Sequence, residues 1–209
     1  MDTTTIAEAE NPELAARGLH GAVVRRDAEE LIGAAELALA LRDGVWRELW
    51  SGVVAPEGRA HDPRTVAAAA LLRTGPHSVL SGTTAAAMHG CTAAADHVVH
   101  VTVPYDRELR SMPGLAVHNA WIRERDIVEL DGLRCQALDV ALCELLCTGP
   151  KRTALACLEQ ALQDLAGHGE QFRALVSRRL DERRDRRGTR RGADLLALAW
   201  SAPLGAEAA

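Results

Sequence analysis

Arginine supplies nearly all the positive charge of this chain, and guanidinium groups recognise phosphates through paired hydrogen bonds. Lysine and arginine together number 24, and Lys151 is the only lysine. The densest cluster is at residues 178–191, where eight arginines stand beside three acids. A segment this basic predicts a stripe that contacts phosphates or a partner. Its candidate contact residues are Arg183, Arg184, Arg186, Arg187, Arg190 and Arg191.

Two other interpretations of this cluster stay open. Asp181, Glu182 and Asp185 are spaced so that a single helix could bring them beside arginines three or four residues away, which predicts a solvated helix held by ion pairs. Alternatively, the cluster docks on an acidic surface, either at the N-terminal end of the same chain or on a partner. Without residues 178–191 the rest of the chain carries a net charge of -10.

A second set of arginines lies in residues 20–58 and supplies the candidate DNA contacts. This set consists of Arg25, Arg26, Arg42 and Arg47. Seven acids in residues 21–58 outweigh these four arginines, so the segment has a net charge of -3. Phosphate contacts dominate affinity for DNA, and an acidic surface opposes them. The segment therefore predicts either a DNA reader or a unit of the same fold used only for protein contacts.

Metal-binding and catalytic patterns are absent from the sequence. The five cysteines include no Cys-x-x-Cys pair, and His97 and His100 would point to opposite sides of a strand. No phosphate-binding loop, G-x-S-x-G or H-E-x-x-H motif occurs. We expect no metal, no cofactor, no catalytic residues and no enzymatic activity. The acids around the expected sheet are interpreted as turn residues, namely Asp96, Asp106, Asp126 and Asp131.

The elements that position the arginines of residues 20–58 follow from local signals. Asp27 is a candidate N-cap for a helix that ends near Ile32. A second helix spans residues 34–42 and stops at Asp43-Gly44, where glycine favours a helix end. A hairpin with a Ser51-Gly52 turn follows. This order predicts a winged helix-turn-helix at residues 20–58, with Trp46 and Trp50 packed against its core rather than stacked on bases.

The remainder, residues 59–200, predicts a mixed domain. Asp62-Pro63 is an N-cap followed by a proline at the first helical position. Residues 97–103 alternate like a strand, and Asp131-Gly132 is a strong hairpin signal. Leucines at helical spacing follow from residue 137. We expect an α+β fold, mainly α, with a flexible arm at residues 1–19 and a tail at residues 201–209.

Composition indicates the cellular location of the chain. Its formal net charge is -5, and 47% of its 209 residues are hydrophobic. No run of 18 apolar residues is present, and residues 1–12 lack the basic and apolar regions of a secretory signal. We therefore expect a cytoplasmic protein without membrane contact, whose five cysteines are reduced thiols.

Several short motifs resemble one family when their order is considered together. Gly44-Val45-Trp46-Arg47 leads to Gly52-Val53-Val54-Ala55, which is similar to a "G-x-W-x-x-L-x-x-G-V-Y-A" wing. Thr84 to Gly90, Val101 to Pro104 and Pro113 to His118 follow in the family order. Asp126 and Asp131-Gly132-Leu133 complete the match over roughly residues 20–200. The chain thus resembles the AbiEi-type antitoxins and regulators of actinobacteria, which belong to type IV toxin–antitoxin systems.

The resemblance implies an N-terminal winged helix that binds promoter DNA and autoregulates its operon, and an antitoxin domain that counters a cognate toxin protein. Many relatives also carry a C-terminal nuclease-like domain of the very-short-patch-repair type, which is not expected in this chain. Family recognition helices are rich in arginine, whereas residues 34–42 are rich in alanine and leucine and include Glu36. A degenerate member that binds only protein is the alternative implied by this departure.

Overall fold

The computed structural model describes residues 17–165 and 167–201, so most of the expected arm at 1–19 and of the expected tail at 201–209 lies outside the described residues. The described helices are α3 (Arg25–Ile32), α4 (Ala34–Arg42), α5 (Pro63–Thr74), α6 (Gly82–Met88), α7 (Leu138–Thr148), α8 (Lys151–Asp164), α9 (Gly169–Glu182) and α10 (Thr189–Ser201). The described strands are β1 (Val23–Val24), β2 (Trp46–Trp50), β3 (Val53–Pro56), β4 (Val79–Leu80), β5 (Val99–Val103), β6 (Leu115–Asn119), β7 (Ile127–Leu130) and β8 (Leu133–Gln136). The mixed helix-and-sheet fold expected from the sequence is confirmed.

The N-terminal part consists of β1, α3, α4 and the β2–β3 hairpin in that order. The three strands form an antiparallel sheet with the order β1-β3-β2. Its small core contains Ala28 from α3, Leu37 from α4 and Trp46 from β2. The helix predicted at residues 34–42 is confirmed with the same bounds. Packing of one apolar stripe from each helix on the hairpin therefore holds this part together.

The predicted N-cap at Asp27 is wrong. Helix α3 begins at Arg25, its N-cap residue is Val24, and Asp27 lies inside the first turn. The reason is the pairing of β1 with β3, which keeps Val24 extended beside Val53. The Arg25 N–H donates to the Gly52 carbonyl at 2.8 Å. Tertiary pairing thus overrides the local cap signal.

Helix α5 joins the N-terminal sheet to the larger sheet. Its predicted start is confirmed, because the Asp62 carboxylate accepts the Thr65 N–H at 3.2 Å and Pro63 occupies the first turn. Four consecutive alanines, residues 67–70, are almost completely buried. Small side chains allow the helix to approach strands closely on more than one side. One apolar cluster accordingly runs from Val53 through α5 to Val101.

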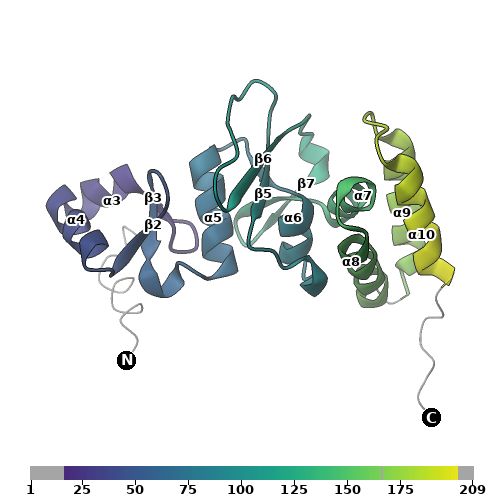
Figure 1. Ribbon diagram of the computed structural model, residues 1–209, viewed down its shortest axis with the longest axis horizontal. Helices are drawn as coiled ribbons and strands as arrows, with labels where there is room; N and C mark the ends of the chain where they lie inside the picture. Colours follow the sequence, from purple (N-terminus) through teal and green to yellow (C-terminus); the bar gives the residue numbers. More distant parts are fainter. Residues whose placement is uncertain (1–16, 166, 202–209) are drawn as a thin grey trace, which may run out of the picture.

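The larger sheet has five strands in the order β6-β5-β4-β8-β7. Strand β5 is parallel to β6 and antiparallel to β4, and β7 and β8 form the predicted hairpin. Its turn contains Asp131 with φ 50° and Gly132 with φ 80°, which confirms the Asp-Gly prediction and the interpretation of Asp131 as a turn residue. Helices α5 and α6 lie on opposite sides of this sheet (Figure 1).

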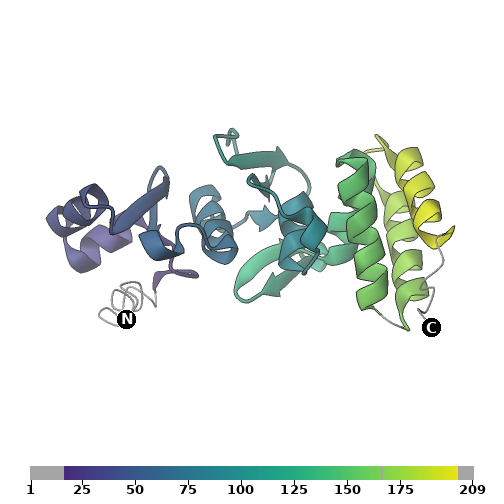
Figure 2. The ribbon, with the colours of Figure 1, turned by 60° about the horizontal axis from the view of Figure 1, so that its bottom comes forward.

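Helices α7 to α10 form the C-terminal part and pack side by side at one end of an elongated molecule (Figure 2). Their core is aliphatic and includes Leu142, Leu146 and Leu158, none of them more than marginally exposed. All five cysteines are buried and free, and most pack in this core as small apolar side chains. Within residues 17–165 and 167–201, no helix has the length and apolar character needed to cross a membrane.

Gly188 closes the turn between α9 and α10 against the end of α7. Its φ is +71°, and a Cβ there would lie 2.1 Å from the Cys147 carbonyl oxygen. Gly167 has a similar φ of +84° but has no atom within 4 Å of such a Cβ. We expect Gly167→Ala to lower the free energy of unfolding by about 1–2 kcal/mol through backbone strain alone.

Gly188→Ala should cost roughly 1–3 kcal/mol more, because overpacking adds to the same strain. Urea unfolding of both variants measures the difference. Equal losses in the two variants would contradict the close packing of this turn on α7.

Candidate functional site

The four arginines predicted to contact DNA are all engaged with carboxylates of the N-terminal part. On α3, Arg25 lies 2.8 Å from Glu29, and Arg26 lies 3.0 Å from Glu30. Arg42 pairs with the adjacent Asp43 at 3.0 Å. The fourth, Arg47 on β2, pairs with Glu57 and also contacts His61. A phosphate would therefore have to compete with a carboxylate for each of these guanidinium groups.

The exposed face of α4 is mostly apolar. Leu37 points into the core, whereas Leu39 is 42% exposed and Ala34, Ala35 and Ala38 are exposed. Arg42 is the cation at its C-terminal end. A helix with this composition offers methyl groups, the carboxylate of Glu36 and the guanidinium of Arg42 to a partner surface.

The two tryptophans of the hairpin pack as predicted. Trp46 is buried in the N-terminal core. Trp50 is partly buried against the larger cluster, and its indole N–H donates to the Pro113 carbonyl at 3.1 Å. This contact fastens the hairpin turn to the loop before β6, so Trp50 is committed to packing rather than to stacking on bases.

The arginine-rich segment does not form a single stripe or a single solvated helix. It is divided by a turn at residues 183–188 between α9 and α10. Within the turn, Arg183 donates to the Asp185 carbonyl and Arg187 pairs with the Asp185 carboxylate at 2.9 Å. Arg186 donates to the Asp181 carbonyl, and Arg191 donates to the Cys147 and Gly149 carbonyls at the end of α7. Most arginines of the cluster therefore make hydrogen bonds or ion pairs within the chain.

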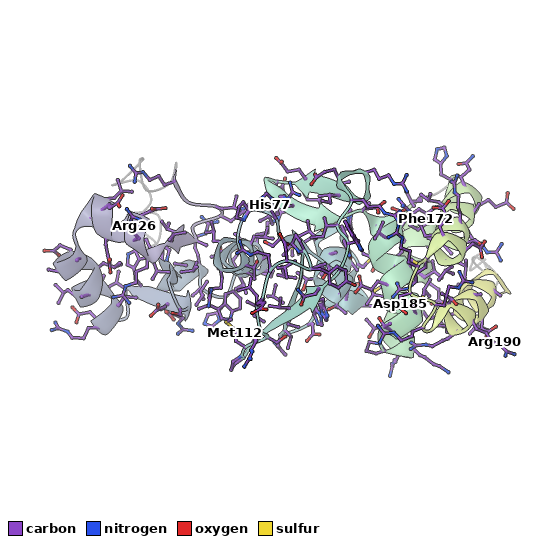
Figure 3. The ribbon with its side chains drawn as sticks, turned by 90° about the horizontal axis from the view of Figure 1, so that it is seen from above. Arg26, His77, Met112, Phe172, Asp185 and Arg190 are labelled. Carbon is purple, nitrogen blue, oxygen red and sulfur yellow. The ribbon has the colours of Figure 1, made fainter. Side chains whose placement is uncertain are left out.

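Docking of this segment on the acidic N-terminal part of the same chain is also wrong. Figure 3 places Arg26 at one end of the molecule and Asp185 and Arg190 at the other. The core of the larger sheet lies between them (Figure 1). The two arginine sets therefore belong to separate surfaces.

The structure instead reveals a cleft of about 870 Å³ between the larger sheet and the C-terminal helices. Its floor is one face of β5 and β6, where His100, Thr102 and His118 point the same way because residues alternate along a strand. Side chains from α6, α7 and the α9–α10 turn form the walls. Loops after β5 and β6 form the rim, with Tyr105 and Trp121 exposed.

Two histidines form a stacked pair on the floor of the cleft. The rings of His100 and His118 are 5.3 Å apart and inclined by 7°. Nδ1 of His100 lies 3.0 Å from Nε2 of His118, and Nε2 of His100 lies 3.8 Å from Asp96. Burial lowers the pKa of His100, and His118 acts in the same direction, while Asp96 and Glu144 oppose the change. Burial therefore favours the neutral form of His100.

One partly buried arginine joins the walls of the cleft. Arg179 on α9 donates to Asp139 at the start of α7 and to Asp126 before β7, each at 2.6 Å. All three side chains are at most 20% exposed. Asp126 was expected to be a turn residue only, and it also anchors this network. The pairing fixes α9, and with it the turn at residues 183–188, relative to the sheet.

Metal ligands do not gather in the part of the chain that the structure describes, because no group of three histidine, cysteine or acidic side chains is placed to hold an ion. His97 lies before β5, and the partner of His100 is His118 rather than His97. The cleft therefore offers hydrogen-bonding and aromatic side chains, not a metal centre.

The sequence analysis selected three arginines that line this cleft, Arg183, Arg184 and Arg187, but it did not predict the histidine pair, the exposed aromatics or the cleft itself. His118 and His100 meet through the parallel pairing of β5 and β6, which has no local signal. Tyr105 and Trp121 carried a usable signal, because they are isolated aromatics in polar loops of a chain with only 3% aromatic residues. A large exposed aromatic side chain often marks a binding surface.

Comparison with known proteins shows a likeness of fold to a solved structure. No family model matches the chain, and no curated protein matches it. The crystal structure of the RV2827C protein from Mycobacterium tuberculosis superposes with a TM-score of 0.60 at 16% identity. The match covers 95% of this chain and 78% of that chain. At this identity the likeness concerns the fold alone.

The lowered pKa of His100 predicts a loss of stability in acid. Above its ordinary pKa of 6.5 the imidazole is neutral in both states. As pH falls below 6.5 the unfolded chain binds the proton first, so the free energy of unfolding falls. Urea unfolding at about pH 7.5 and about pH 5.5 should show a smaller drop for His100→Gln than for the unmodified chain. An identical drop would contradict the burial of a neutral His100.

The Arg179 network predicts a large cost when its cation is removed. Arg179→Met removes the arginine that contacts both carboxylates at 2.6 Å and leaves Asp126 only its longer contact with Arg125, and the expected loss is about 3–5 kcal/mol of unfolding free energy. Arg125→Met is the matched control, because Arg125 lies 4.0 Å from the same Asp126 but is 68% exposed. The control should lose less than about 1 kcal/mol. If urea unfolding showed the same loss of unfolding free energy for both variants, the contacts of Arg179 with two carboxylates would not account for the loss.

Proposed function

We propose that this chain is a DNA-binding regulator of the AbiEi antitoxin type, which acts by binding rather than by catalysis. The N-terminal part is the proposed DNA-binding unit, and promoter DNA is the proposed ligand. The remainder is the proposed antitoxin domain, with a cognate toxin as its protein partner. The proposal places the protein in the cytoplasm, where both partners would be found.

The observation that carries this proposal is the order and pairing of the N-terminal elements. A short strand, two helices and a hairpin, closed into an antiparallel sheet with order β1-β3-β2, match the arrangement of a winged helix. In that arrangement α4 is the helix that enters the major groove, and β2 and β3 form the wing. The exposed face of α4 and the start of α3 then face DNA together.

The ion pairs of this unit are compatible with phosphate binding. Side chains of Arg26 and Arg42 are 84% and 74% exposed, and their pairs are therefore weak, worth about 1 kcal/mol or less. A phosphate can replace the carboxylate at small cost and releases counterions from DNA. Affinity is expected to be modest, because the acids remain beside the bound backbone.

A second candidate function is contact with a protein through the same face. Leu39 and Val45 are 42% and 53% exposed, and both lie at the C-terminal end of α4 or just after it. An exposed apolar pair beside alanines suits a protein surface better than a polar groove. This alternative predicts that Leu39→Asp weakens binding to the product of the adjacent gene, measured by calorimetry with the purified partner, without affecting DNA.

The test of DNA binding is a fluorescence-anisotropy titration of the full chain with promoter DNA and scrambled DNA at two salt concentrations. Arg42→Gln should weaken binding and reduce the salt slope by roughly 0.9. Glu30→Gln should strengthen binding, because it frees Arg26 from its carboxylate. Arg125→Gln is the control, since Arg125 is an exposed arginine outside the N-terminal part.

Promoter-selective binding with these opposite effects supports the regulator. The proposal fails if the chain does not bind the promoter at micromolar concentration in low salt. It also fails if Arg125→Gln weakens binding as much as Arg42→Gln, since the contacts would then be diffuse.

A further inference from the structure

The rim of the cleft presents two of the few aromatic side chains of this chain to solvent. Trp121 is 74% exposed and Tyr105 is 65% exposed. Each follows the carboxyl end of a parallel strand, β6 for Trp121 and β5 for Tyr105. Ligands of sheets with parallel strands commonly bind outside these ends. Asn119 joins the two loops, because its amide donates to the Pro104 and Arg107 carbonyls.

Two arginines of the cleft are available for an anion. Arg123 and Arg184 line it, and their guanidinium groups make no hydrogen bond or ion pair within residues 17–165 and 167–201. Arg187 and Tyr105 also line the cleft, and the pKa of Arg187 is raised first by Asp185 and further by Tyr105. An aromatic ring and guanidinium groups thus border the same space.

Five carboxylates line the cleft, and none of them pairs with Arg123 or Arg184; four have another partner, and the fifth is Glu182. The engaged pairs are Asp126 with Arg179, Asp185 with Arg187, Asp96 with His100, and Glu144 with Gln136. The Thr83 hydroxyl on the wall is buried and has no hydrogen-bond partner among the described residues. An unpaired buried polar group of this kind is consistent with a site that a ligand or water completes.

The combination of stacking surfaces, hydrogen-bonding groups and free guanidinium groups suits one ligand class. Bases stack on aromatic rings whatever their sequence, and phosphates pair with arginine. A volume of about 870 Å³ lies in the range of small-molecule sites and excludes a duplex. We propose that the cleft binds a nucleotide, with its base on Trp121 and Tyr105 and its phosphate on Arg123 and Arg184.

The nucleotide is either a free small molecule or the exposed end of a single strand, since both present the same base and phosphate. None of the cleft residues belongs to the N-terminal part, so this site is independent of the proposed contact with promoter DNA. A chain that fails to bind the promoter could still bind a nucleotide here, and the reverse also holds.

The test is isothermal titration calorimetry of the full chain with AMP, GMP, CMP and UMP, and with a single-stranded tetranucleotide of thymidine. Saturable binding is expected for at least one of these probes. Trp121→Ala should weaken it roughly tenfold, the usual effect of losing one stacked base. Arg184→Ala should weaken it to a similar degree through the loss of a charged hydrogen bond.

Arg190→Ala is the matched control, because Arg190 is an exposed arginine of the same segment that does not line the cleft. Trp121 and Arg184 are exposed, so their variants should unfold in urea like the unmodified chain. Preference for mononucleotides indicates a free ligand, and preference for the tetranucleotide indicates a strand end. Absence of binding at millimolar concentration, or binding that Trp121→Ala and Arg184→Ala leave unchanged, overturns the proposal.

Discussion

One partly buried arginine, Arg179, links the C-terminal helices to the larger sheet. Arg179 lies between Asp126 and Asp139, and its two contacts join α9 to the start of α7 and to the segment before β7. Removing a charge from water is costly unless partners replace the lost hydrogen bonds. The position of Arg179 is therefore favourable only while it contacts both carboxylates. Because α9 leads into the turn at residues 183–188, the network sets where the arginines of that turn stand. The wall of the cleft is therefore set in part by a contact between two of the residues that line it, Asp126 and Arg179.

Helix α5 packs between the N-terminal sheet and the larger sheet, and so lies between the proposed DNA-binding face and the cleft. Its buried alanines pack on both sheets, and the Thr65 hydroxyl donates to the His20 carbonyl at 2.6 Å. Trp50 adds a hydrogen bond between the hairpin and the loop before β6. The N-terminal part is thus fixed to the rest of the chain and not merely tethered to it. The proposed DNA-binding face and the cleft nevertheless lie apart from each other. This separation is compatible with the two proposed ligands, promoter DNA at the first and a nucleotide at the second.

Local signals predicted the elements whose structure is local. The helix at residues 34–42, the start of α5 and the Asp131-Gly132 turn depend on caps, periodicity and backbone conformation within a few residues. Long-range contacts could not be predicted in this way. Asp27 lost its role as a cap to strand pairing, and Gly188 divides a segment whose charge pattern suited a continuous helix. The partners of Arg179 are 40 and 53 residues away, and the histidine pair arises from strand register. The sequence therefore predicted three arginines of the cleft, Arg183, Arg184 and Arg187, but not the cleft that they line, although its two exposed aromatics were a usable signal.

The central claim is that the N-terminal part contacts promoter DNA while the arginine-rich turn serves the structure. Amide hydrogen exchange followed by mass spectrometry, on the full chain with and without a promoter duplex, tests this most directly. The account predicts slower exchange in peptides from α3, α4 and β2 when the duplex is present. It predicts no change at residues 183–191, whose arginines are mostly occupied by carbonyls and Asp185. Protection confined to residues 183–191, with none in the N-terminal part, would contradict it.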